Sequence, residues 1–166
     1  PSVGMNRSGE YVVVWQDCTG SCHIYGQRYS ADGSSLGSQL TISTHANSYF
    51  SDVDVAICDS GKFVAVWTSD GLDTNGYGVS AQRYDADGQK EGVEFLANSY
   101  STGTQGRPSV SMDGNCNFVV VWESEGLDGD GYVVFGQQFN ADGSPFGTEF
   151  PVNQYTQSDQ NQATVA

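Results

Sequence analysis

A short apolar run that ends in tryptophan occurs three times along the chain. The three copies are Tyr11–Trp15, Phe63–Trp67 and Phe118–Trp122. A half-buried strand alternates apolar and polar residues, but these runs are apolar at every position. A strand that is apolar on both faces is covered on both sides, as when one sheet is stacked between two others. We therefore predict that each run belongs to a sheet that has a neighbouring sheet on either side.

Two further motifs follow each run at a constant spacing. Gln-Arg-Tyr at 27–29 and 82–84 and Gln-Gln-Phe at 137–139 begin 55 positions apart, as do the Ala-Asp-Gly triplets at 31, 86 and 141. Asp-Gly between two strands favours a hairpin, because glycine accepts the positive φ that the turn needs. The first two tryptophans are only 52 positions apart, so the first repeat has a loop three residues shorter. Each repeat reads as four short strands, the size of a propeller blade.

These patterns predict an all-β fold of three four-stranded antiparallel, blade-like (propeller-like) repeats, plus one extra C-terminal strand. The expected units are 1–52, 53–107 and 108–162, followed by 163–166 as the first strand of a fourth repeat or as an exchanged strand. The last unit follows from the match of Ala163-Thr164-Val165-Ala166 to the start of the third repeat. In the third strand, Gly26, Ala81 and Gly136 share one position, where we expect a neighbouring sheet to approach closely.

Charge excludes two classes of partner. The 166 residues contain 6 Lys and Arg against 20 Asp and Glu, a net charge of −14. Nucleic-acid binding needs a basic surface, so we expect no nucleic-acid partner. Membrane insertion is not expected either, because no apolar stretch approaches the roughly 20 residues of a spanning helix. The chain is 37% hydrophobic and only 16% charged, which indicates a folded protein and not a disordered polyanion.

The cysteines and one sequon point to a secreted or extracellular surface protein. Cys18 and Cys22 are spaced to close a small hairpin loop as a disulfide. Cys58 and Cys116 either form a second bridge or stay as two unpaired thiols. Asn6-Arg7-Ser8 is a formal N-glycosylation sequon, so Asn6 is a candidate glycosylation site and the protein a candidate glycoprotein.

Two acidic loops are candidate calcium sites. They follow the second and third tryptophans, and their candidate ligands are Asp70, Asp73, Asn75, Glu125, Asp128 and Asp130. Calcium takes six to eight oxygen ligands, which alternate side chains and backbone carbonyls of a tight loop can supply. The bidentate Glu of a complete EF-hand is absent. The alternative is a hairpin turn that uses Asp-Gly or Asn-Gly for backbone reasons alone.

The remaining side chains include candidate sugar contacts but no catalytic motif. Tyr49, Tyr100 and Tyr155 lie in the polar links between repeats and are candidate glycan contacts, with packing between blades as the alternative. The repeated tryptophans and glutamines are expected to serve the core and the sheet backbone. His23 and His45 occupy unrelated positions with no nucleophile motif nearby. We therefore expect no enzymatic activity.

The repeat consensus resembles a known type of bacterial repeat. Trp67 to Tyr77 and Trp122 to Tyr132 share the pattern Trp-x-Ser-x-Gly-Leu-Asp-x-(Asp or Asn)-Gly-Tyr, followed by the Gln-x-aromatic and Ala-Asp-Gly motifs. This resembles the tandem repeats, roughly 50–55 residues long, of large bacterial secreted and surface proteins, sometimes beside RTX-type or adhesin modules. The resemblance implies an extracellular array and covers nearly the whole chain. The first repeat departs from it at Cys18 and Cys22.

The expected function is structural. The chain would be a unit or segment of a surface array or filament, in which copies join head to tail by strand sharing through 163–166 and by sheet stacking. The alternative is a carbohydrate-binding adhesin or lectin with one site per repeat. The two hypotheses differ in their partners, which are copies of the chain itself in the first and glycans in the second.

Overall fold

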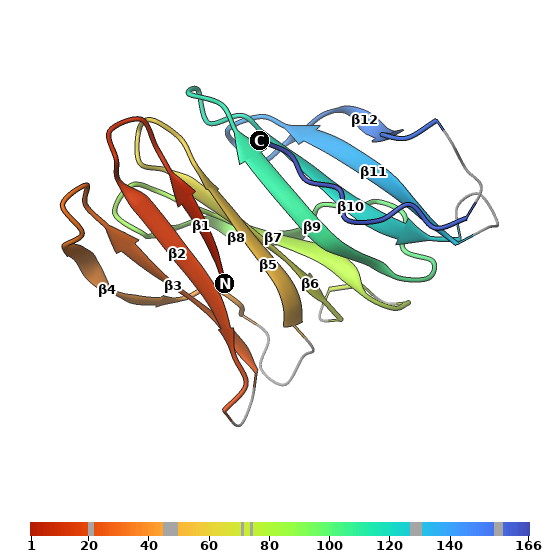
Figure 1. Cartoon of the computed structure of the whole chain (residues 1–166), viewed down its shortest axis with the longest axis horizontal. Coiled ribbons are helices and arrows are strands. Elements are labelled where there is room, and N and C mark those ends of the chain that lie inside the picture. Colours follow the sequence, from red (N-terminus) through yellow and green to blue (C-terminus); the bar gives the residue numbers. More distant parts are fainter. Residues whose placement is uncertain (20–21, 45–49, 71, 74, 127–130, 155–157) are drawn as a thin grey trace.

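The computed structural model confirms the all-β fold and describes residues 1–19, 22–44, 50–70, 72–73, 75–126, 131–154 and 158–166 (Figure 1). These residues form twelve strands in three four-stranded antiparallel sheets. Sheet 1 contains β1 (Ser2–Met5), β2 (Tyr11–Asp17), β3 (His23–Tyr29) and β4 (Ser35–Thr41). Sheet 2 contains β5 (Phe50–Ile57), β6 (Phe63–Ser69), β7 (Gly78–Tyr84) and β8 (Lys90–Leu96). Sheet 3 contains β9 (Gln105–Met112), β10 (Phe118–Glu125), β11 (Tyr132–Phe139) and β12 (Pro145–Pro151).

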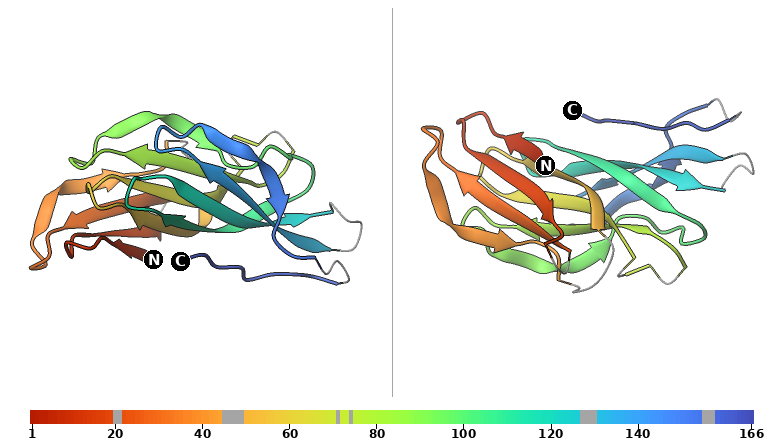
Figure 2. Two further views of the ribbon diagram at one scale, coloured as in Figure 1. Left: turned by 90° about the horizontal axis from the view of Figure 1, so that it is seen from above. Right: turned by 60° about the horizontal axis from the view of Figure 1, so that its bottom comes forward.

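The three sheets are arranged as a fan. Within each sheet the strands follow chain order, and the first strands β1, β5 and β9 lie next to one another (Figures 1 and 2). The fourth strands, β4, β8 and β12, lie farther apart (Figure 2, left). This is the relation between neighbouring blades of a propeller, whose first strands meet near the axis.

Two apolar cores hold the sheets together, one at each interface. Between sheets 1 and 2 the core includes Val12, Val14, Phe63, Ala65 and Trp67. Between sheets 2 and 3 it includes Val64, Val66, Phe118, Val120 and Trp122. All seven residues of β6 are buried, whereas β2 alternates between buried and half-buried positions along its apolar run. The predicted coverage on both faces is therefore confirmed for the middle sheet.

The small residues of the third strand serve a different purpose from the one we expected. A Cβ on Gly26 would lie 3.1 Å from Cδ1 of Ile42, and one on Gly136 would lie 2.9 Å from Cζ of Phe150. Both neighbours belong to the same repeat as the glycine, so the space is filled by the repeat's own fourth-strand region. The close approach between sheets occurs instead at Gly4, where a Cβ would lie 2.8 Å from the carbonyl oxygen of Val55.

The repeated glutamines stabilise an irregularity inside each sheet. Nε2 of Gln27, Gln82 and Gln137 donates to the carbonyl of the next residue at 3.0, 2.9 and 2.7 Å. The ladder between the third and fourth strands shifts register at these glutamines. A bulge leaves backbone groups without a ladder partner, and the amide side chain supplies one. The glutamines therefore serve the backbone, as expected.

The Ala-Asp-Gly triplets form the predicted hairpin turns. Gly33, Gly88 and Gly143 have φ values of 85°, 83° and 84°. In the first turn, Asp32 Oδ1 accepts hydrogen bonds from Ser30 Oγ at 2.6 Å and from the Ser34 amide at 3.0 Å. These bonds lower the pKa of Asp32 to about 2. The turn carboxylates thus act as caps for local backbone and hydroxyl groups.

Asp54 joins the first strands of all three sheets. Its Oδ1 accepts a hydrogen bond from Ser2 Oγ at 2.5 Å, and its Oδ2 accepts one from Ser109 Oγ at 3.1 Å. The Val110 amide also donates to Asp54 Oδ2, at 2.9 Å. The bond from Val110 to Asp54 has an equivalent 55 positions later, where the Val165 amide donates to Ser109 Oγ at 3.3 Å. Residues 163–166 therefore occupy the place expected for the first strand of a fourth repeat.

The segment before residue 163 also repeats the structure found 55 positions earlier. The Gln105 amide donates to the Tyr77 carbonyl at 2.8 Å, and the Gln160 amide donates to the Tyr132 carbonyl at 2.8 Å. The C-terminal segment is extended and runs beside sheet 3 (Figure 2), without a β-ladder partner among the described residues. Strands β5 and β9 begin at Phe50 and Gln105, slightly ahead of the expected unit boundaries.

The expected Cys18–Cys22 disulfide is present, and Cys58 and Cys116 form a second bridge and are not unpaired thiols. Cys18 and Cys22 close a loop within sheet 1, and Cys58–Cys116 links the first hairpin turns of sheets 2 and 3. Cys116 has φ 67° and occupies the turn position that Gly61, with φ 84°, holds in the second repeat. Cys58 occupies the position of Asp113, whose carboxylate caps its own turn. Each cysteine thus replaces a favourable turn residue in order to link two sheets, and two disulfides favour an oxidising, extracellular environment.

We predict that the two disulfides differ in their contribution to stability. Cys58–Cys116 closes a sequence separation of 58 residues and Cys18–Cys22 closes 4. Chain-entropy arguments give about 4 kcal/mol for the long loop and about 2 kcal/mol for the short one. Urea unfolding of the double variants Cys58→Ala/Cys116→Ala and Cys18→Ala/Cys22→Ala measures both losses. Equal losses, or a larger loss for the short loop, would contradict the role of Cys58–Cys116 as the link between sheets.

Candidate functional site

A non-glycine residue in the left-handed conformation recurs once per repeat. Asp52, Arg107 and Gln162 have φ values of 51°, 50° and 60°, and they lie 55 positions apart. In β5 and β9 the ladder to the second strand shifts register at this position. Left-handed backbone is unfavourable for residues with a Cβ, and such outliers cluster at functional sites. All three residues are exposed.

At Arg107 and Gln162 the left-handed backbone is fixed by side chains from the preceding repeat. The Arg107 amide donates to Thr68 Oγ1 at 3.0 Å, and the Gln162 amide donates to Glu123 Oε1 at 2.6 Å. Thr68 and Glu123 are equivalent residues, because each directly follows the tryptophan of its repeat. The second strand of one repeat thus holds the start of the next.

Side-chain contacts extend these two bonds into a continuous network. Thr68 Oγ1 donates to Asp52 Oδ2 at 3.4 Å, and Arg107 Nη1 donates to Glu123 Oε2 at 3.0 Å. The network runs from Asp52 through Thr68, Arg107 and Glu123 to Gln162, and so crosses from sheet 2 to sheet 3 and on to the C-terminal segment. The Glu123 side chain is only 3% exposed, whereas that of Arg107 is 59% exposed. A buried carboxylate needs such donors, and the guanidinium supplies the charged one.

A cavity of about 280 Å³ opens between sheets 2 and 3 at this network. We call it the inter-sheet cleft. Its lining includes the side chains of Asp52, Thr68, Tyr77, Arg107, Glu123 and Tyr132. The residues come from both sheets and from the loops that follow their second strands, so the cleft exists only when the sheets are stacked.

The lining of the cleft suits a ligand rich in hydroxyl groups. Asp52 and Glu123 contribute carboxylates, Thr68 a hydroxyl and Arg107 a guanidinium. Sugar hydroxyls both donate and accept hydrogen bonds, so this mixture can serve them. Tyr77 and Tyr132 add rings with an apolar body and a polar tip. Two carboxylates and one guanidinium leave the cleft with net negative formal charge, which disfavours acidic ligands.

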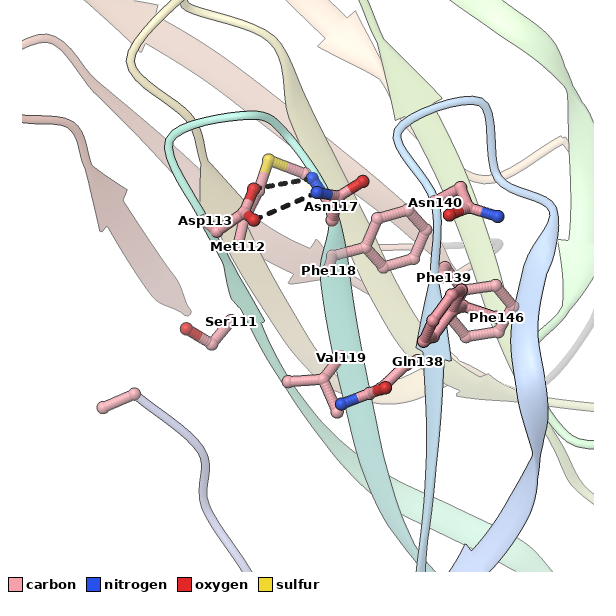
Figure 3. A pocket seen from close by; sticks show the side chains of 11 residues that line it. Ser111, Met112, Asp113, Asn117, Phe118, Val119, Gln138, Phe139, Asn140 and Phe146 are labelled. Atoms are coloured by element: carbon pink, nitrogen blue, oxygen red, sulfur yellow. Dashed lines mark hydrogen bonds between the residues drawn. The ribbon is translucent and has the colours of Figure 1, made fainter.

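A second cavity of about 580 Å³ lies on sheet 3 at its outermost face (Figure 3). Val119, Gln138 and Phe146 line it, and Phe146 is 63% exposed. The backing rings Phe118 and Phe139, with centroids 4.9 Å apart, are 3% exposed and belong to the core between sheets 2 and 3. Asn117 donates two hydrogen bonds to Asp113 at the turn beside these rings.

The open face of sheet 3 is equivalent to faces that the next sheet covers elsewhere. Ile42, Ala97 and Val152 follow the fourth strand at the same repeat position. They are 0%, 5% and 49% exposed. The first two are covered by the following sheet, and Val152 is not. Sheet 3 therefore presents an apolar face of the kind on which a further sheet packs.

The acidic loops use their described carboxylates on local groups. Asp73 is 7% exposed, and its Oδ1 accepts the Asn75 amide at 3.1 Å. Glu125 Oε2 accepts the Thr104 amide at 3.2 Å. Within the described residues, no group of three or more His, Cys, Asp or Glu side chains gathers to hold a metal. Asp70 is also described, whereas Asp128 and Asp130 lie outside the described residues, so calcium at these loops stays a prediction.

The other predicted site residues are dispersed. Tyr49, Tyr155 and His45 lie outside the described residues. Tyr100 is half-buried in the link between sheets 2 and 3, and it is not among the lining residues of the inter-sheet cleft. His23 is half-buried, with its ring centroid 6.0 Å from that of Tyr25.

Asn6, the sequon residue, is engaged in its own turn. It is 7% exposed, and its Oδ1 accepts the Ser8 and Glu10 amides. Its Nδ2, the atom that glycosylation modifies, donates to Glu10 Oε2 at 3.0 Å. A glycan would have to be added before this turn forms. Glycosylation at Asn6 stays a prediction.

The cleft residues were missed because the repeats do not share them. Asp, Arg and Gln occupy one position, and Thr and Glu occupy its partner position. A repeat consensus discards such variable positions. The sequence does mark their position, because Thr68 and Glu123 each directly follow the tryptophan that every repeat contains.

Comparison with known proteins identifies a related fold. A scan against family models and a search of curated protein sequences returned no match. Among solved structures, the endo-arabinase from Bacteroides thetaiotaomicron VPI-5482 matches with a TM-score of 0.50 and 13% identity. The match covers 95% of this chain and 56% of the arabinase chain, so this chain spans little more than half of its structural neighbour. The likeness establishes the fold alone.

The arabinase match corrects one expectation. We expected no enzymatic activity, because the sequence offered no recognisable catalytic motif. The fold of this chain is shared with an enzyme, so the exclusion of enzymes is contradicted. The error has a physical reason: carboxylates such as Asp52 and Glu123 meet at one cleft only through stacking of the sheets, and their spacing along the chain gives no sign of it.

No described helix is long and apolar enough to cross a membrane.

Proposed function

We propose that this chain is an extracellular carbohydrate-binding repeat protein whose glycan lies in the inter-sheet cleft. The observation that carries the proposal is the lining of that cleft, where the Asp52 and Glu123 carboxylates, the Arg107 guanidinium and two tyrosines face one cavity. Two disulfides support an extracellular location.

The hydrogen-bonding groups of the cleft are held in place before any ligand binds. Thr68 Oγ1 accepts a hydrogen bond from the Arg107 amide at 3.0 Å, and Glu123 Oε2 accepts one from the Arg107 guanidinium at 3.0 Å. Groups that are ordered in advance lose little freedom on binding, which favours affinity for a flexible sugar chain. Asp52 is exposed and so can accept hydrogen bonds from sugar hydroxyls.

Charge narrows the class of glycan. The cleft has two carboxylates against one guanidinium, and the whole chain has a net charge of −14. Both disfavour uronate-rich or sulfated chains, so a neutral glycan fits best. The structural neighbour is named an endo-arabinase, which makes arabinose-containing oligosaccharides the first probe.

We predict that neutral oligosaccharides bind and that the cleft tyrosines carry part of the affinity. Replacing Tyr77 or Tyr132 with Ala removes ring contacts and should weaken binding by about tenfold, which corresponds to about 1.4 kcal/mol. Isothermal titration calorimetry with arabino-oligosaccharides and a panel of other neutral oligosaccharides measures the effect. Release of reducing ends in the same samples reports hydrolysis.

Two control variants locate the binding site. Tyr100→Ala changes a tyrosine of the link outside the cleft lining, and Val93→Ala changes a side chain that is 82% exposed on β8. Both should bind like the wild type. A loss of binding in Tyr100→Ala with unchanged binding in the cleft variants would place the site in the links. No binding of any neutral glycan would overturn the proposal.

We also propose a second candidate function, in which copies of the chain stack through the open face of sheet 3. The exposed Val152 favours it, because its equivalents Ile42 and Ala97 are buried under a following sheet, and Phe146 adds a second exposed apolar side chain. The polar links between sheets are not reproduced at this face. Arg28 and Arg83 donate to the Ala86 and Ala141 carbonyls of the next repeat, but Gln138 replaces the arginine in sheet 3. Stacking of copies would therefore depend on apolar burial.

For this second candidate we expect concentration-dependent association. Wild-type protein should form larger species in sedimentation velocity as its concentration rises, and Phe146→Ser/Val152→Ser should remain monomeric. Val93→Ser, on the fourth strand of sheet 2, is the matched control for added surface polarity. A wild-type chain that is monomeric at all concentrations rules out the stacking function.

A further inference from the structure

The three left-handed residues have the same backbone conformation but different side chains. Asp52, Arg107 and Gln162 are acidic, basic and neutral at one repeat position. Glycine adopts positive φ without strain, and glycine is used at many turns of this chain with φ between 73° and 131°. At these three positions the chain carries a side chain despite the strained backbone. A strained side chain that is retained once per repeat is expected to have a use.

The network places two of these side chains at the cleft. Asp52 and Arg107 line the cavity itself, and the Gln162 amide is bound to Glu123 of its wall. All three residues are exposed, whereas Val55 and Val110, three residues after Asp52 and Arg107, are 4% and 5% exposed. The left-handed turn of the backbone thus directs one side chain per repeat outward, immediately before the strand enters the core.

We propose that Asp52 and Arg107 are the specificity-determining residues of the cleft, with Asp52 selecting neutral over acidic glycans. This rests on the proposed function. The constant part is the left-handed backbone at positions 52 and 107, which Thr68 holds at Arg107. The variable part is the side chain that meets the ligand, so exchanging it changes which sugar binds without rebuilding the site. With Asp52 in place, the cleft has net negative charge.

Charge reversal at position 52 tests the assignment by gain of binding. Asp52→Arg changes the cleft from two carboxylates and one guanidinium to one carboxylate and two guanidinium groups. Arg107 shows that arginine fits this backbone. The variant should bind oligogalacturonate at least tenfold more tightly than the wild type does, and neutral oligosaccharides more weakly. Asp87→Arg, at an exposed hairpin turn outside the cleft, makes the same change in net charge and is the control.

Glycine substitution tests whether the side chain, and not the backbone, is used. Asp52→Gly keeps the left-handed backbone and removes an exposed side chain that no buried charge depends on, so the melting temperature should be unchanged or higher while glycan affinity falls at least fivefold. Ser111→Gly, at a regular extended position on β9, should lower the melting temperature and leave glycan affinity unchanged.

The outcomes separate this inference from the proposed function. A wild-type protein that binds no glycan overturns the proposed function and this assignment with it. A wild-type protein that binds neutral glycans, together with an Asp52→Arg variant of unchanged preference, overturns the assignment alone. The assignment also fails if Asp87→Arg gains oligogalacturonate binding equally, because the effect then comes from net charge.

Discussion

Burial of the second strand on both faces is the constraint on which the rest of this structure depends. Val64, Val66 and Trp67 of β6 are all 0% exposed, and their contacts lie on two different sheets. Full burial of one large apolar side chain contributes roughly 1.5–3 kcal/mol, so a handful of such residues decides whether the sheets stack. A single four-stranded sheet of this sequence would expose that surface to water. Stacking is therefore a condition for stable folding of each repeat.

Stacking also creates the polar features of the molecule. When the sheets pack, the residue after each tryptophan meets the start of the next repeat, and Thr68 accepts the amide of Arg107. Asp54 bridges the first strands at the same time. The cleft is thus a product of the apolar interface, with its walls on two sheets and its strained positions held from the neighbouring repeat. Fold and site depend on the same contact between sheets.

The sequence predicted the features that are local or repeated, and missed those that arise between repeats. The doubly apolar runs, the Asp-Gly turns and the backbone role of Gln82 followed from short-range patterns. The function of Gly26 was misread, because the side chain that fills its space, Ile42, comes from later in the same repeat. Asp52 and Arg107 were missed because they share no residue type. Their common property is a φ angle, imposed by a partner in another sheet.

Amide hydrogen exchange at residue resolution tests the stacked arrangement most directly. The Arg107 amide has its acceptor, Thr68 Oγ1, on the neighbouring sheet, although the Arg107 side chain itself is exposed. If the sheets stack as described, the Arg107 amide exchanges slowly, at a rate close to that of the β9 ladder amides, and Thr68→Ala accelerates it selectively. An Arg107 amide that exchanges at the rate of an open loop in the wild-type protein would contradict the account.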